Sequence, residues 1–138
     1  MKKPVFLYNE AMSESFLKPS DAKWSEYRYY LDQSEHEKKD LLKKKFQDFL
    51  LMTEMIASML YKKFSVQKVF LIGSLLDFDW FHDHSDIDIV VEGLDPKQYF
   101  KAWLEIENIT DGEPFHLIDI NDISEEFYSK VITKGRLL

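Results

Sequence analysis

Two short apolar segments, joined by a glycine turn and a polar loop, constrain the fold of this chain more than any other feature. Residues 69–72 run directly into Gly73-Ser74, and after a loop of eleven residues Asp86 and Asp88 open the second segment. Short apolar runs bounded by turn residues are typical of buried strands. Because side chains alternate between the faces of a strand, both aspartates should point to one side and the isoleucine between them into the core.

Two helices are predicted before these strands. A cap at Ser20 begins a short one, and the Ser-x-x-Glu capping box of Ser34 and Glu37 begins a longer one. An apolar stripe at helical spacing predicts the buried side of the longer helix: Leu42, Phe46, Phe49, Ile56 and Leu60. We therefore expect residues 1–33 to form an N-terminal arm with a short helix, and residues 34–138 to form one globular domain.

A third strand and two further helices are predicted after the strand pair. Asp95-Pro96 has the form of a helix cap with proline in the first turn, residues 115–120 have the composition of a strand, and a last helix runs from about Ser124 to Gly135. Four residues are expected on the buried side of the first of these helices: Tyr99, Phe100, Trp103 and Leu104. The order predicts an α/β (α+β) fold, a small mixed β-sheet flanked by helices, with an N-terminal helical extension.

Composition limits the functional classes. The chain has 138 residues, no cysteine and a formal net charge of −7. The acidic balance argues against a protein that tracks the phosphate backbone of DNA or RNA, and favours a cation, a metal-bound small ligand or a basic partner. The absence of cysteine excludes disulfides and thiolate zinc sites. No run is apolar enough for a membrane span, so we expect a cytoplasmic protein.

The paired aspartates and the Gly-Ser turn predict a metal–phosphate site. Asp86 and Asp88 would repel each other unless a cation bridges them, and paired oxygen ligands favour Mg²⁺ with a phosphate completing its shell. Gly73 lets the backbone approach a phosphate closely, and Ser74 can donate to it. The alternative is a solvated strand face, which is the common role of an isolated Asp-x-Asp.

The order and spacing of these motifs resemble the minimal nucleotidyltransferase (MNT) domains of the DNA polymerase beta-like nucleotidyltransferase superfamily. Their signature is Gly-Ser, about ten residues, then Asp-x-Asp, and the resemblance covers about residues 66–138. It implies the nucleotidyltransferase fold, with Gly73 and Ser74 holding a nucleoside triphosphate such as ATP. It also implies that Asp86 and Asp88 are catalytic residues that bind Mg²⁺ or Mn²⁺.

Two departures from the family pattern concern the site. The basic segment that usually follows Gly-Ser is replaced here by residues 75–78, which carry no cation. The third catalytic acid, on the last strand, aligns with His116, which could act as a general base. Asp119 lies an odd number of residues from His116, so a regular strand would turn it to the other face.

The resemblance implies transfer of a nucleoside monophosphate, AMP from ATP, to a hydroxyl. The acceptor in related small members is a HEPN-domain toxin, which the family member neutralises as an antitoxin. The alternative is a catalytically degenerate protein that binds and neutralises a partner without transfer. An antibiotic-modifying transferase is a third reading, but the chain has little room for a separate drug-binding domain. The oligomeric state stays open, and an oligomer is possible.

Two other clusters have both a structural and a functional interpretation. His82, Asp83 and His84 could form a transition-metal site with Asp86, although a polar active-site loop is the simpler interpretation. Four aromatic residues near the N-terminus could face a partner or pack on the domain, and we favour packing on the domain. They are Trp24, Tyr27, Tyr29 and Tyr30.

Overall fold

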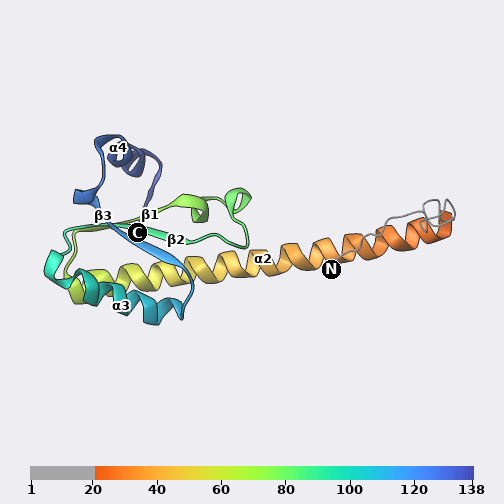
Figure 1. The fold of residues 1–138 in the computed structure, drawn as a ribbon, viewed down its shortest axis with the longest axis horizontal. Helices are drawn as coiled ribbons and strands as arrows, with labels where there is room; N and C mark the ends of the chain where they lie inside the picture. The colour runs from red at the N-terminus through yellow and green to blue at the C-terminus, as the bar shows by residue number, and fades with distance from the viewer. Residues whose placement is uncertain (1–20) are drawn as a thin grey trace, which may run out of the picture. The chain divides into compact units, whose positions relative to one another are not determined.

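The computed structural model of the protein describes residues 21–138 (Figure 1). The chain divides into two compact units, Met1–Asp40 and Leu41–Leu138. Residues 1–20 of the predicted arm, with the cap at Ser20, lie outside the described residues, and the predicted domain boundary at residue 34 stays a prediction.

Helix α2 spans Asp21–Phe64 without interruption, so the prediction of two separate helices is wrong. Ser34 lies inside the helix and does not begin one. The physical reason is composition: residues 21–40 contain neither glycine nor proline and are rich in helix-forming side chains, so nothing interrupts the backbone hydrogen bonds. The aromatic group (Trp24, Tyr27, Tyr29 and Tyr30) is exposed along this part of α2, and its packing on the domain stays a prediction.

Four strands form one mixed sheet. They are β1 (Lys68–Ile72), β2 (Ile87–Glu92), β3 (Phe115–Asp119) and β4 (Arg136–Leu137), in the order β3-β2-β1-β4. Strand β1 pairs antiparallel with β2 and β4, whereas β2 and β3 are parallel. The three predicted strands are confirmed, but β4 was missed because two residues carry no recognisable pattern.

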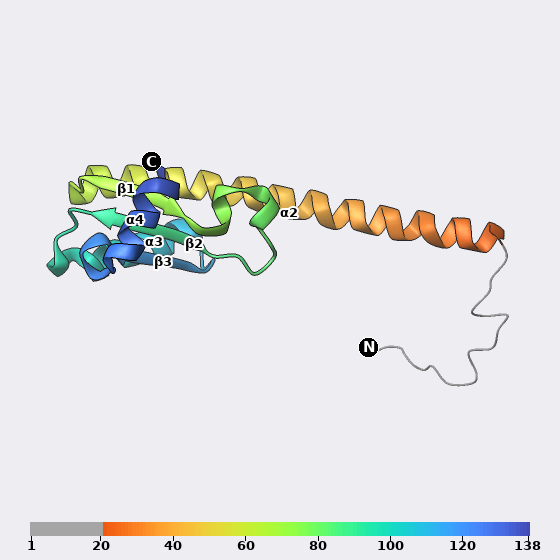
Figure 2. The ribbon, with the colours of Figure 1, turned by 90° about the horizontal axis from the view of Figure 1, so that it is seen from above.

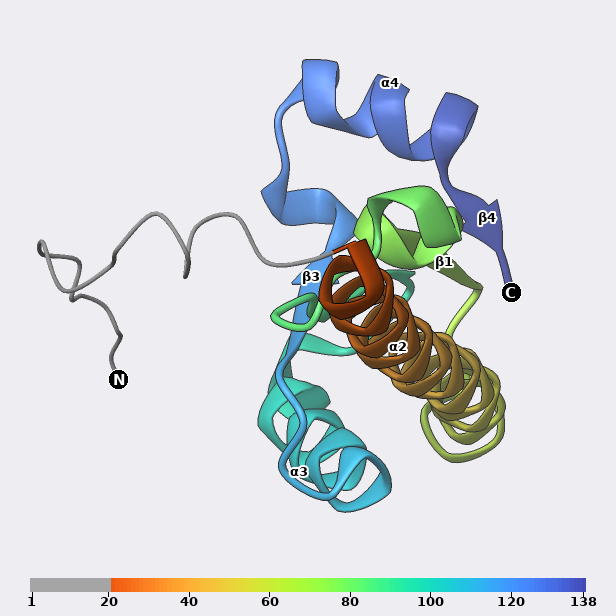
Figure 3. The same ribbon diagram turned by 90° about the vertical axis from the view of Figure 1, so that its right-hand side faces the viewer.

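Helices cover both faces of the sheet, with α2 and α3 on one side and α4 on the other (Figures 1 and 3). Figure 2, seen from the α4 side, shows α4 lying in front of the strands. The larger core cluster lies on the α2 and α3 side and includes Phe49, Ile56 and Leu60 of the predicted helix stripe. Leu42 and Phe46 pack against it while partly exposed. The smaller cluster lies on the α4 side and comprises Phe70, Val90, Ile120 and Val131.

Helix α3 spans Tyr99–Thr110 and corrects one sequence prediction. The Asp95 carboxylate accepts a hydrogen bond from the Lys97 amide at 2.9 Å, capping a short 3-10 turn over Pro96–Gln98 that leads into α3. The predicted buried side is half right: Tyr99 and Trp103 pack against the core, but Phe100 and Leu104 are exposed. The fully buried positions are instead Ala102, Ile106 and Thr110. These three positions are four residues apart and so lie on one face of the helix, whereas the predicted stripe was drawn through the aromatic residues and Leu104.

Helix α4 spans Glu125–Lys134 and begins where the sequence predicted. The Ser124 hydroxyl accepts a hydrogen bond from the Phe127 amide at 3.1 Å, and Gly135 ends the helix. Among the described residues, no helix is long and apolar enough to cross a membrane.

Candidate active site

The Gly-Ser turn follows β1 directly and begins a 3-10 turn over Gly73–Leu76. Gly73 has a φ of +83°, a region that favours glycine. A Cβ atom at this position would lie 2.7 Å from Asp88 Oδ2. Glycine is therefore needed here both for the backbone conformation and for the close approach of the Asp88 carboxylate.

Asp86 immediately precedes β2 and Asp88 lies on it, and the alternation of the strand is as predicted. Ile87 and Ile89 are fully buried in the larger core, while the side chains of Asp86 and Asp88 are 36% and 28% exposed. Asp88 pairs in register with Ile72 at the end of β1. The sheet therefore places Asp88 beside the Gly-Ser turn.

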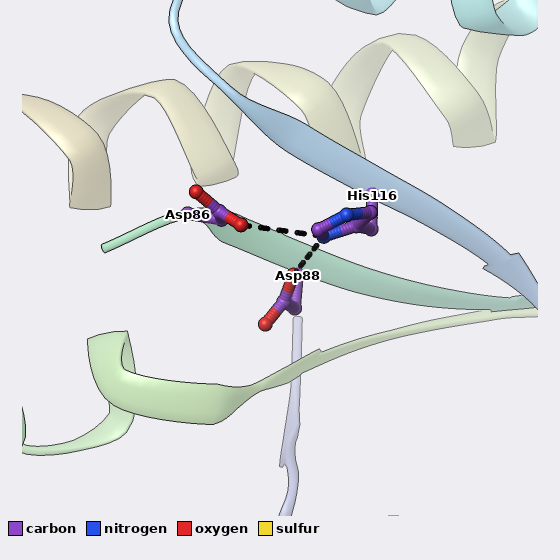
Figure 4. Close-up of side chains that lie close together, drawn as sticks. All are labelled: Asp86, Asp88 and His116. Carbon is purple, nitrogen blue, oxygen red and sulfur yellow. Dashed lines mark hydrogen bonds and ion pairs between the residues drawn. The ribbon is translucent and has the colours of Figure 1, made fainter. Parts of the chain in front are cut away.

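His116 on β3 completes a convergent group with the two aspartates (Figure 4). The parallel pairing places His116 opposite Asp88. Its Nδ1 lies 2.8 Å from Asp88 Oδ1, a hydrogen bond, and 3.7 Å from Asp86 Oδ2. Asp86 and Asp88 were predicted from their spacing and His116 from the family resemblance, and the structure places all three side chains close together.

The donor set of this group fits a divalent cation. One ligand atom from each of Asp86, Asp88 and His116 lies within 4.8 Å of the other two. Carboxylate oxygens and imidazole nitrogen are ordinary ligands for divalent metals. Among residues 21–138, this is the group of acidic and histidine side chains whose geometry suits a metal ion, and Asp86, Asp88 and His116 would hold it.

A cavity of about 390 Å³ adjoins the Gly-Ser turn. It is lined by apolar and cationic side chains and by the turn itself: Ile72, Gly73, Ser74, Leu76, Trp80, Phe127, Lys130, Val131, Lys134 and Gly135. Lys130 and Lys134 lie one helical turn apart on α4, so they bring two positive charges to the side of the turn. Trp80 is 65% exposed and offers an aromatic face beside them.

Sequence reasoning missed the two lysines of this cavity. The cations expected directly after Gly-Ser are absent there, but α4 supplies cations from a distant part of the chain. The available signal was the i, i+4 spacing of Lys130 and Lys134 on the last predicted helix. That signal is weak, because such lysines are usually only solvated.

The loop between the turn and β2 is held by its own hydrogen bonds. Buried Ser85 accepts from the His82 amide at 2.9 Å, and His82 Nδ1 accepts from the His84 amide at 3.1 Å. Lys45 Nζ donates to the Asp83 carbonyl at 2.7 Å. Within the described part of the chain, the convergent metal-type group includes neither histidine of this loop, which favours the interpretation of a polar loop.

Asp119 lies outside the convergent group, as its odd spacing from His116 predicted. Its carboxylate accepts a hydrogen bond from the Asn121 amide at 2.9 Å and so shapes the turn after β3. Burial raises the pKa of Tyr99, and the nearby charges of Asp122 and Asp119 raise it further. The Tyr99 hydroxyl donates a hydrogen bond to the Leu117 carbonyl, which links α3 to β3.

Comparisons with known proteins found one family model and two solved structures that resemble this chain. The family model described as "Polymerase beta, Nucleotidyltransferase" matches residues 54–138. A solved toxin–antitoxin structure with AMP-PNP is 24% identical, covers 62% of this chain and 70% of that chain, and has a TM-score of 0.49. The toxin–antitoxin structure MntA-HepT is 22% identical, with 64% and 68% coverage and a TM-score of 0.45. None of the curated proteins matches this sequence. The range matched by the family contains the Gly-Ser turn and the whole convergent group.

Proposed function

Because this chain belongs to the polymerase beta nucleotidyltransferase family, we propose that it transfers a nucleoside monophosphate, AMP from ATP, to a hydroxyl group. The hydroxyl oxygen would bond to the α-phosphorus, the bond from this phosphorus to the bridging oxygen would break, and pyrophosphate would leave. The observation that carries the proposal is the position of Asp88. Its carboxylate lies against Gly73 and within hydrogen-bond distance of His116, so the turn and the metal-type group form one site.

Each side chain of the proposed site would have a separate role in the reaction. A bound Mg²⁺ or Mn²⁺ supplies charge neutralisation at the phosphate oxygens. Asp86 and Asp88 would hold this ion, and the Ser74 hydroxyl would donate a hydrogen bond to the triphosphate. Lys130 on α4 adds positive charge at the cavity wall. His116, 61% exposed, could take the proton of the attacking hydroxyl only while its Nδ1 binds no metal ion. Where His116 is a third ligand of the ion, that proton would pass to solvent water.

We propose a protein as the acceptor, of the HEPN-toxin class that the MNT resemblance implies, with an antitoxin role for this chain. The net charge of −7 supports a protein acceptor over DNA or RNA, because a nucleic-acid substrate would be repelled. The exposed Trp80 at the mouth of the cavity is suited to stacking against an adenine base.

Two observations favour the alternative of a binding protein without transfer activity. The hydrogen bond from His116 Nδ1 occupies Asp88 Oδ1, an oxygen that a metal ion would need. Asp77 and Asp79 add negative charge in the loop that follows the Gly-Ser turn. A protein with this hydrogen bond intact could neutralise a partner by binding alone.

Transfer to a co-purified HEPN toxin distinguishes the two functions. The full chain is incubated with the toxin, α-labelled ATP and Mg²⁺ or Mn²⁺, and label on the toxin is counted. We expect labelling by the native chain and a loss of at least about a hundredfold in Asp88→Asn, because the metal would be lost. Asp111→Asn is the matched control, since Asp111 is exposed in the left-handed region that asparagine tolerates.

Two results would contradict the transferase. The first is no label on the toxin with either metal. The second is equal labelling by the native chain and Asp88→Asn. Toxin neutralisation that survives in Asp88→Asn without any labelling would establish the binding alternative.

A further inference from the structure

We propose that the group of Asp86, Asp88 and His116 selects a divalent first-row transition metal over Mg²⁺. The inference deepens the proposed function, on which it rests, by naming the metal class of the same site. It depends on the one ligand that is not an oxygen, the His116 imidazole.

The distances suit a shared ion with little rearrangement. Two ligand atoms that each lie about 2.1 Å from one metal are about 3 Å apart when adjacent and about 4 Å apart when opposite. His116 Nδ1 is 2.8 Å from Asp88 Oδ1 and 3.7 Å from Asp86 Oδ2. In Figure 4 the two carboxylates approach the imidazole from different sides.

The fold keeps the nitrogen at this position. His116 is fixed opposite Asp88 by the parallel register of β2 and β3, and Leu117 next to it is buried in the larger core. On the other side of Asp88, the carboxylate lies close to Gly73, since a Cβ atom built there would come within 2.7 Å of Oδ2. A metal bound by the two aspartates would therefore meet the imidazole as well.

Nitrogen in the ligand set separates the two classes of metal. Mg²⁺ takes oxygen ligands in a near-ideal octahedron and loses water reluctantly, so an imidazole in place of a carboxylate weakens its binding. First-row transition metals accept imidazole more readily than Mg²⁺ does, and Mn²⁺, which has the weakest preference for nitrogen in that series, is therefore the strictest probe. One carboxylate fewer also removes a negative charge that Mg²⁺ would use. The side chain at position 116 should therefore set the ratio of the two affinities.

The test measures metal binding directly, without nucleotide or toxin. Calorimetric titrations of the full chain with Mn²⁺ and with Mg²⁺ give the two dissociation constants, and His116→Asp is titrated in the same way. We expect the native chain to bind Mn²⁺ at least about a hundredfold more tightly than Mg²⁺. His116→Asp should reduce this ratio at least about tenfold, mainly through tighter Mg²⁺ binding. His36→Asp is the matched control, because it makes the same exchange at an exposed histidine of α2 outside the group.

A second readout identifies the nitrogen ligand itself. Pulsed electron paramagnetic resonance of the Mn²⁺ complex should show coupling to one imidazole ¹⁴N in the native chain and in His36→Asp. The coupling should be absent in His116→Gln, which also serves if His116→Asp does not fold. An unchanged affinity ratio in His116→Asp, or no ¹⁴N coupling in the native chain, would overturn the inference. Because these measurements contain no nucleotide or toxin, they test metal selection even if the labelling assay shows no transferase activity. In the same way, the labelling assay tests transfer even if the site shows no metal preference.

Discussion

The two faces of the sheet differ in how many apolar side chains they bury, and the candidate active site lies on the face that buries fewer. On the face covered by α2 and α3, a large continuous cluster buries the alternate β2 residues Ile87, Ile89 and Val91. On the face covered by α4, only Phe70, Val90, Ile120 and Val131 form the buried cluster among the described residues. Asp88 belongs to this second face, because it alternates with the isoleucines. The dense face holds the strands rigid, and the sparse face leaves room for a cavity and for partly exposed charges.

The largest effect is expected for Gly73→Ala on the site face. The new methyl group would lie 2.7 Å from Asp88 Oδ2 at a positive φ, so either the turn or the carboxylate must move. We expect nucleotidyl transfer to fall about a hundredfold, equal to ~2.7 kcal/mol, together with weaker metal binding. Labelling assays and calorimetry measure the two.

Gly112→Ala is the matched control for this change. Gly112 has nearly the same φ, +87°, but a Cβ atom there would meet nothing within 4 Å. It should show the cost of the backbone conformation alone, about 1 kcal/mol of folding stability, with metal binding intact. Equal losses of metal binding in the two variants would contradict the role assigned to Gly73.

The contrast in packing is tested by two adjacent valines of β2. Val91 faces the large cluster and Val90 the small one, and both are fully buried. Each change to alanine removes about 1.6 kcal/mol of transfer free energy, and a cavity cost is added where the surroundings cannot collapse. We expect the free energy of unfolding to fall by about 2.5 kcal/mol for Val91→Ala and about 1.5 kcal/mol for Val90→Ala, as measured by urea unfolding. A larger loss for Val90→Ala would reverse the comparison.

Removing the cavity lysines should have a moderate effect on the site face. Lys130 also lies 4.0 Å from Glu126, so part of its charge is already compensated. We expect the double variant Lys130→Ala/Lys134→Ala to bind ATP about tenfold more weakly, with a smaller loss at high salt. Lys62→Ala/Lys101→Ala, at exposed positions outside the cavity, is the control. Equal ATP affinities of the two double variants would show that Lys130 and Lys134 do not contribute to ATP binding.

The smallest effect is expected at Tyr99 on the α2 and α3 face, and it depends on pH. Burial raises the pKa of this phenol, with Asp122 and Asp119 adding to the shift. The folded state therefore favours the neutral phenol, a stabilisation that is complete below about pH 10 and is lost as the pH rises through the raised pKa.

Tyr99→Phe should cost about 1 kcal/mol at pH 8, where the hydrogen bond to the Leu117 carbonyl is lost, and less at pH 11. Urea unfolding at the two pH values measures the difference, with Tyr128→Phe on α4 as the control. A cost that does not shrink with rising pH would contradict this account.

Local patterns in the sequence predicted the sheet and half of the site. Strands β1, β2 and β3 were recognisable because each is a short apolar run, and the period of two on β2 correctly placed Asp86 and Asp88 on one side. The same reasoning failed at Ser34, where a capping motif lies within a continuous helix because no glycine or proline precedes it within α2 to end the helix. Lys130 was not predictable as part of the site, because only the packing of α4 over the Gly-Ser turn brings it there.

The position of His116 at the margin of the sheet has a consequence for how this protein can change. Strand β3 is an outer strand of the sheet, and the His116 side chain is 61% exposed. Replacing it should cost little folding stability, since no core contact is lost. Under the proposed metal binding, folding stability and metal preference are therefore separable properties. The side chain at this one surface position could be exchanged, by an engineer or by natural selection, with the scaffold unchanged.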